Sequence, residues 1–121
     1  MYEEHVLEHF RNPYHKGSLP AASLPVYSGK SVSQVCGDEI EIHVSIRNGV
    51  IADICWQGDG CCFSQAAASM LTKYADGKPI DGMKRFDEER MLELFKAECP
   101  AARRGCVLVA FHALRKALQK A

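Results

Sequence analysis

The stretch at residues 58–64 contains a cysteine placed where a thiolate would be stabilised. Cys61 follows an alternating strand pattern and comes just before a small-residue helix expected over residues 65–74. The first N–H groups and the positive dipole end of a helix favour an anion, and glycines at the turn leave the sulfur uncovered. Cys61 is therefore a candidate metal ligand or sulfur nucleophile. The alternative is that Cys61 and Cys62 are small buried apolar side chains.

Two other places along the chain carry related chemistry. Cys36 and Asp38 lie in a tight loop between two predicted strands, and Cys106 lies near the start of the last predicted helix, beside two arginines that would stabilise a thiolate. Three thiolates and a carboxylate suit a tetrahedral metal ion or the thiolate-rich coordination of an iron–sulfur cluster. The chain has no C-x-x-C pair, so the spacing alone leaves open that these cysteines are unrelated.

Three strands are expected to position these residues. Residues 26–35 form a weak strand, interpreted as an edge strand because serines and a glycine interrupt its valines. Over residues 39–47, isoleucine and valine alternate with polar side chains, which is typical of a half-buried antiparallel strand. Asn48-Gly49 is a hairpin turn signal, and residues 50–57 form the returning strand.

The register of this hairpin can also be predicted. A plain two-residue loop would place Asp53 opposite Val44 and bury a carboxylate. We therefore expect a bulge or a longer loop, which turns Cys55 away from the core. With that shift, the apolar face of the returning strand consists of Ala52, Ile54 and Trp56.

Helices occupy most of the remaining chain. A short amphipathic helix is expected over residues 2–10, where His5 and His9 share one face as solvated histidines or, alternatively, as a zinc pair. Asp87 is predicted to cap a helix that Cys99-Pro100 ends. Strands grouped early and helices grouped late predict an α+β fold, a three-stranded antiparallel sheet with helices packed on one face. We expect a single domain over residues 1–121.

Composition excludes several classes of function. The chain has 121 residues, with 47% apolar and 25% charged side chains, and its 15 basic and 15 acidic residues balance. Nothing therefore indicates binding to nucleic acid or to an anionic membrane. No apolar run reaches the ~20 residues of a spanning helix, and the acidic start lacks the pattern of a signal peptide. We expect a cytoplasmic protein, in which the six cysteines are reduced rather than paired in disulfides.

The order of these motifs resembles the iron–sulfur scaffold family typified by IscU, SufU and the N-terminal part of NifU. The resemblance rests on Cys36-Gly37-Asp38, on Gly60-Cys61 with the small-residue helix after it, and on Cys106 in a late helix. The stretch at residues 9–17, HFRNPYHKG, is similar to the opening of that family. The match extends over essentially the whole chain.

The resemblance implies a scaffold on which iron and sulfide are assembled into a labile cluster, a [2Fe–2S] cluster above all. A cysteine desulfurase would supply sulfur as a persulfide, with Cys61 or Cys106 as acceptor, and the cluster would pass to apo-proteins or carriers. The implied ligands are Cys36, Asp38, Cys61 and Cys106, which also suit zinc. Because a carboxylate is a harder ligand than a thiolate, Asp38 would make the cluster easier to release.

Two alternatives remain open from the sequence. A zinc-bound sulfur acceptor of the SufU type would be a sulfurtransferase rather than a scaffold, and a structural zinc module would serve interactions only.

The chain also departs from the family pattern at some positions. Gly105 stands where IscU-type members have a histidine and SufU-type members a basic residue. Residues 99–103 keep only one proline of the segment that a dedicated chaperone recognises, so the resemblance does not imply that partner. For Cys55, Cys62 and Cys99 the expectation is inert packing, with a persulfide on Cys62 as the alternative.

Overall fold

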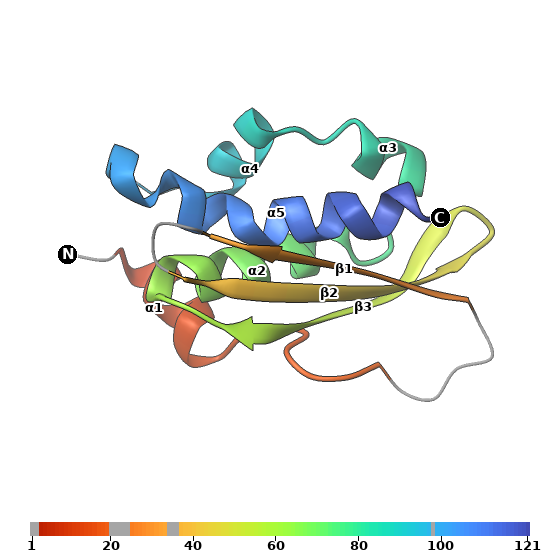
Figure 1. The fold of residues 1–121 in the computed structure, drawn as a ribbon, viewed down its shortest axis with the longest axis horizontal. Helices are drawn as coiled ribbons and strands as arrows, with labels where there is room; N and C mark the ends of the chain where they lie inside the picture. The colour runs from red at the N-terminus through yellow and green to blue at the C-terminus, as the bar shows by residue number, and fades with distance from the viewer. Residues whose placement is uncertain (1–2, 20–24, 34–36, 98) are drawn as a thin grey trace.

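The computed structural model describes residues 3–19, 25–33, 37–97 and 99–121, so that Cys36 and the end of the first predicted strand lie outside the described residues. The described chain contains five α-helices, one short 3-10 helix and three strands, and Figure 1 shows how they are arranged. In chain order they are α1 (Glu4–Arg11), β1 (Val26–Val32), β2 (Glu39–Arg47), β3 (Val50–Asp59), α2 (Cys62–Ala75), α3 (Ile80–Lys84), α4 (Glu88–Phe95), η1 (Ala101–Arg103) and α5 (Arg104–Gln119). Within these ranges, none of the helices is long and apolar enough to cross a membrane.

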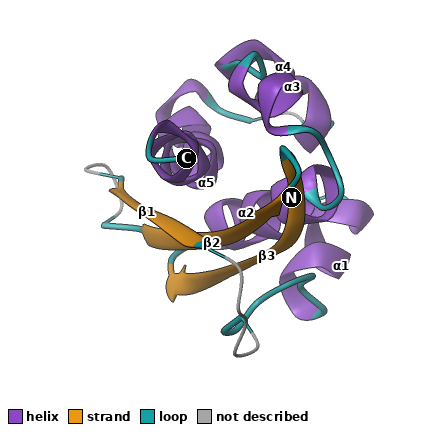
Figure 2. Cartoon of the chain, turned by 90° about the vertical axis from the view of Figure 1, so that its right-hand side faces the viewer, coloured by secondary structure: helices purple, strands orange, loops and turns teal. Residues whose placement is uncertain are grey.

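The three strands form one antiparallel sheet in the order β1-β2-β3, and the α+β prediction is confirmed. Helix α5 packs across β1 and β2, whereas α2 packs on β3 and alongside α5. In Figure 2, α5 is seen along its axis next to β1, and α3 and α4 lie beyond it. Apolar side chains from the sheet and from these helices form one core cluster, with Trp56 and Phe95 among its largest buried members.

The predicted irregularity in the hairpin is a β-bulge next to a tight turn. Ile46 pairs with Ile51 across the turn, and the register then shifts so that Val44 pairs with Ile54. The extra residue is Ala52, which is half-buried, whereas Ile51 is fully buried on the core side. The prediction that Ala52 belongs to the apolar face was therefore wrong, because the bulge lies inside β3, after Ile51, and the Asn48-Gly49 turn itself stays short.

The opposite face of β3 carries Cys55, as predicted. Cys55 pairs with His43 but is only 5% exposed. The loop at residues 15–19 covers it, because Lys16 forms a parallel bridge with Trp56 along the outer side of β3. Burial raises the pKa of the Cys55 thiol. This cysteine is a packing residue, consistent with the expectation from the sequence.

The edge strand β1 is held by close contact with α5. A Cβ atom on Gly29 would overlap the carbonyl oxygen of Ala113, so only glycine lets the helix approach this closely. Lys116 donates to the carbonyl oxygen of Lys30 at 2.9 Å, and Lys120 donates to that of Ser28 at 2.6 Å. These bonds cover part of a strand that would otherwise present unpaired groups to solvent.

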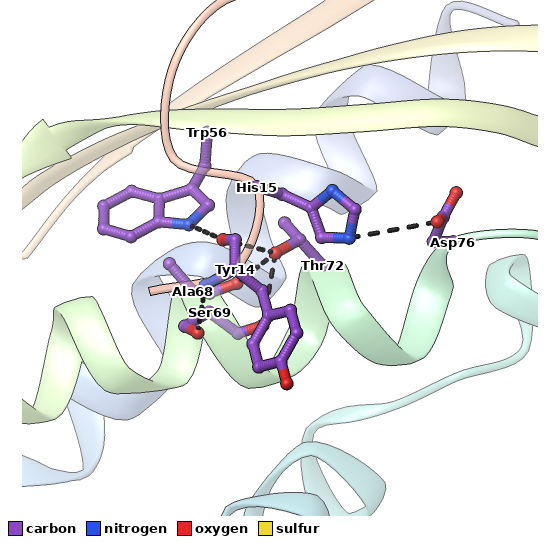
Figure 3. Close-up of polar contacts among 7 residues, drawn as sticks. All are labelled: Tyr14, His15, Trp56, Ala68, Ser69, Thr72 and Asp76. Carbon is purple, nitrogen blue, oxygen red and sulfur yellow. Dashed lines mark hydrogen bonds and ion pairs between the residues drawn. The ribbon is translucent and has the colours of Figure 1, made fainter. Parts of the chain in front are cut away.

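A polar network fixes α1 and the loop after it against α2 and β3 (Figure 3). The Trp56 indole N–H donates to the Tyr14 carbonyl oxygen at 2.8 Å, and the Tyr14 backbone N–H donates to Ser69 Oγ at 2.8 Å. The His9 ring lies 2.7 Å from the same Ser69 hydroxyl, and His5 bonds to the Phe95 carbonyl oxygen at 2.8 Å. Both histidines are thus half-buried docking residues, and the prediction of solvated histidines was wrong.

The ends of α4 differ in how well the sequence predicted them. Asp87 caps the start as expected, because its side chain accepts a hydrogen bond from the backbone N–H of Arg90 at 2.9 Å. The helix ends at Phe95, where Lys96 adopts the left-handed conformation typical of a helix C-cap. It therefore stops before Cys99-Pro100, the break that the sequence suggested.

Candidate metal centre

The centre begins where Ser33, Gly37 and Asp38 are joined by backbone hydrogen bonds between β1 and β2. The Ser33 backbone N–H donates to the Asp38 carbonyl oxygen at 2.7 Å, and the Gly37 N–H donates to the Ser33 carbonyl oxygen at 2.8 Å. Gly37 has a φ of 69°, which glycine adopts without strain. These bonds hold Asp38 at the start of the central strand, where the residue is 2% exposed.

Cys61 meets this aspartate at the start of α2. Cys61 is the N-cap residue, and its backbone N–H donates to Asp38 Oδ1 at 3.0 Å. Its thiol lies 3.6 Å from Asp38 Oδ2. One carboxylate oxygen therefore satisfies a free N–H group at the helix start, while the other faces the sulfur. The predicted position of Cys61 at a strand-to-helix joint is confirmed.

Two glycines make this approach possible, as the sequence suggested. Gly58 has a φ of 143°, and a side chain there would overlap the Glu39 carbonyl oxygen of the neighbouring strand. At Gly60, an added Cβ would overlap Ser64 Oγ and would lie 2.9 Å from Asp38 Oδ1. Gly60 is thus required for the contact between the β3–α2 turn and the Asp38 carboxylate.

Cys106 completes the cluster from the first turn of α5. It is fully buried, as expected for a residue on the face of α5 that packs against the sheet. One ligand atom each from Asp38, Cys61 and Cys106 lies within 4.8 Å of the other two, which is the one such group among the described histidine, cysteine and acidic residues. Two thiolates on a single zinc ion are about 3.8 Å apart, given a tetrahedral angle and a ~2.3 Å bond. Small side-chain shifts therefore suffice to bring these atoms to ligand distance.

Other cysteines lie around this group without joining it. Cys62 is half-buried and packs against the hydrophobic core, and burial raises the pKa of its thiol. Burial also raises the pKa of the Cys99 thiol. The charge of Arg104 lowers that pKa, and Cys61 raises it. A thiol with a raised pKa is less often a thiolate at neutral pH, which is consistent with the expectation that both residues serve in packing.

The structure thus brings together three of the four residues singled out in the sequence. Cys36, the fourth, lies outside the described residues. Ser64 supports the site in a way that the sequence reasoning missed: its hydroxyl donates to the Cys61 carbonyl oxygen at 3.0 Å. A serine three residues after an N-cap is the signal that was available for this contact.

Fold and site together define a class of protein. It is a small α+β protein in which residues at the start of the central strand, of α2 and of α5 bring one carboxylate and two thiols together as a candidate metal centre. The family of the NifU-like N-terminal domain matches residues 1–120, and the chain belongs to this family.

Relatives and solved structures agree with this assignment. The chain is 31% identical over 122 residues to the iron–sulfur cluster assembly enzyme IscU of Drosophila melanogaster, covering 98% of this chain and 76% of the relative. It is 27% identical over 118 residues to the iron–sulfur cluster assembly scaffold protein IscU of Buchnera aphidicola, covering 97% and 91%. A crystal structure of a NifU-like N-terminal protein from Brucella abortus superposes with a TM-score of 0.77 at 21% identity, covering 98% and 92%. The last comparison supports the fold.

Proposed function

We propose that this chain is an iron–sulfur cluster assembly scaffold, with the whole of residues 1–121 acting as one scaffold domain. The observation that carries the proposal is the convergence of Asp38, Cys61 and Cys106 within 4.8 Å. Relatives named as cluster assembly scaffolds support the same function. Cys36, in the loop beside Asp38, is the proposed fourth ligand. The cargo is an iron–sulfur cluster, and [2Fe–2S] is the form we propose.

The ligand set suits a cargo that must be released. Thiolates are the usual ligands of iron–sulfur clusters, whereas a carboxylate is a harder ligand that holds such iron less firmly. Asp38 Oδ1 is already engaged by the Cys61 backbone N–H. Asp38 Oδ2 is the oxygen that would bind iron, so the weakest ligand is also the one oriented by a fixed hydrogen bond.

Cys61 is the better placed of the two candidate persulfide acceptors. It is half-buried, whereas Cys106 is fully buried. In the proposed step, the Cys61 thiolate attacks the outer sulfur of a persulfide on a cysteine desulfurase; that S–S bond breaks, and the desulfurase cysteine leaves as a thiolate. The transferred sulfur is at the sulfane level, so converting it into sulfide takes two electrons from a separate electron donor. Apo iron–sulfur proteins or carriers are the proposed recipients, in the cytoplasm.

Anaerobic reconstitution with iron, cysteine and a desulfurase tests this function. We expect a visible charge-transfer spectrum in the wild-type chain, and its loss in the Cys61→Ser variant. Cys62→Ser is the matched control, because it changes the neighbouring, half-buried thiol of the same turn and should leave the spectrum intact.

Two other results would overturn the scaffold proposal. Retained zinc with faster desulfurase turnover and no colour would make the chain a sulfur acceptor. Tight zinc with neither colour nor stimulation would leave a structural zinc module.

A further inference from the structure

Two serine hydroxyls in this molecule are buried with no hydrogen-bond partner among the described residues. They belong to Ser33, which is 6% exposed, and to Ser45, which is fully buried. A buried hydroxyl without a partner costs desolvation free energy, so each such group calls for an explanation. One explanation is that the hydroxyl finds its hydrogen-bond partner on a molecule that the protein binds during its function.

Ser33 lies beside the metal centre. Its backbone N–H donates to the Asp38 carbonyl oxygen, and its carbonyl oxygen accepts from the Gly37 N–H. Its hydroxyl faces the start of α5, since a Cβ added to Gly105 would lie 3.7 Å from Ser33 Oγ. Gly105 immediately precedes Cys106, so the hydroxyl stands between the elements that supply two of the three clustered ligands.

Residue 105 places no side chain in front of this buried hydroxyl. Apart from the neighbours of Gly105 in the chain and the backbone of α5 itself, Ser33 Oγ is the one described atom within 4 Å of the position of a Gly105 side chain. A larger residue at position 105 would contact the hydroxyl or cover it, whereas glycine leaves it facing the ligand end of α5.

Ser45 provides the internal contrast. It pairs with Asp53 near the β2–β3 hairpin, six residues along β2 from Glu39, which is about 20 Å at ~3.3 Å per residue. The metal centre is at the opposite end of the same strand. The two serines thus share burial and lack of a partner, and differ in their distance from the site.

We propose that the Ser33 hydroxyl donates a hydrogen bond to a sulfide of the cluster bound at the Asp38–Cys61–Cys106 centre. Ser33 is then a positioning residue for the cargo, placed next to Gly105, where α5 carries no side chain. This inference rests on the scaffold function proposed above. Hydrogen bonds to cluster sulfurs are a known means by which proteins tune cluster stability and potential, and partners beyond the ligands contribute substantially to binding.

The test compares Ser33→Ala, Ser33→Thr and Ser45→Ala with the wild-type chain. Melting of the metal-free proteins comes first: because each alanine removes a hydroxyl without a partner, neither variant should lose stability. After anaerobic reconstitution, the cluster in Ser33→Ala should be lost to a chelator about tenfold faster than in the wild type. Its charge-transfer bands should shift to longer wavelength, because the sulfide loses a hydrogen bond. Ser33→Thr should restore both properties, and Ser45→Ala should match the wild type.

Cobalt binding separates an effect on the cargo from an effect on the ligands. Titration with Co²⁺ alone probes the protein ligands without any sulfide, and Ser33→Ala should bind Co²⁺ as tightly as the wild type. Equal loss of Co²⁺ affinity would overturn the proposal, since Ser33 would then act by holding the ligands. Wild-type cluster kinetics in Ser33→Ala would overturn it as well, while leaving the scaffold function standing. Failure of the wild type to assemble a cluster would instead refute the scaffold function.

Discussion

Two polar clusters join α2 to the rest of the molecule, and they differ in the kinds of groups that they bring together. At the middle of the helix, Ser69 bonds to Tyr14 and His9, and the neighbouring Trp56 N–H is also satisfied. At the start of the helix, Asp38 and Cys61 converge with Cys106, bringing a carboxylate and two sulfurs together. The first cluster pairs donors with acceptors, whereas the second gathers groups that all donate electron pairs.

This difference distinguishes a structural network from a binding site. A closed set of hydrogen bonds stabilises the fold and leaves nothing to bind. Anionic or electron-rich groups held close together repel one another unless a cation or a proton lies between them. The two clusters lie on the same helix: the middle of α2 anchors α1, and its N-terminus places Cys61 in the candidate metal centre.

The comparison predicts its largest stability effect at Ser69. Ser69→Ala would leave the Tyr14 backbone N–H and the His9 ring without a partner, so we expect a loss of about 1–3 kcal/mol in the free energy of unfolding. Chemical denaturation measures this loss, and Co²⁺ affinity should stay unchanged. Ser45→Ala is the control, because it removes a buried hydroxyl that makes no hydrogen bond within the described chain. Lost Co²⁺ affinity in Ser69→Ala would mean that the two clusters are not independent.

Asp38 tests whether the second cluster is built for release. In Asp38→Ala we expect a reconstituted cluster to live about tenfold longer, because the hard, weak ligand is gone. Asp38→Asn retains an oxygen that can accept from the Cys61 N–H, and so separates the ligand effect from the capping effect. The half-life under transfer to a chelator is the measurement. A shorter half-life in Asp38→Ala would contradict the role of a labile ligand.

The smallest expected effect concerns pH and His9. Burial, Lys73 and His5 lower the pKa of His9, and Glu8 opposes them. Because the folded state favours the neutral ring, its contribution to stability is fully present above the ordinary histidine pKa. It is lost as the pH falls below that value and through the lowered pKa of the folded state. The melting temperature of the wild type should therefore decrease slightly from pH 7 to pH 5. In His9→Gln this decrease should be smaller. An unchanged pH dependence in that variant would remove His9 from the explanation.

Local sequence patterns predicted the helices and strands well, but they did not predict contacts between distant residues. The alternation over β2 and the aspartate in the following hairpin strand together required a bulge, since burying Asp53 costs more than inserting a residue. The pattern did not fix whether the turn itself would lengthen, because Ile51 and Ala52 are both apolar enough for the core face. The histidines of α1 were misjudged for a different reason: the partners of His5 and His9, on Phe95 and Ser69, are 90 and 60 residues away in the chain.

The sequence by itself determined the α+β class, the need for an irregularity in the β2–β3 hairpin and the position of Cys61 at a helix start. Strand alternation, glycines and capping residues act over a few neighbours, so local patterns encode these features. Only the tertiary structure decided that Asp38, Cys61 and Cys106 meet. Their proximity depends on how α2 and α5 cross the sheet, and that packing is set by contacts between distant parts of the chain. The same packing leaves the Ser33 hydroxyl buried beside Gly105, a relation that no spacing along the sequence encodes.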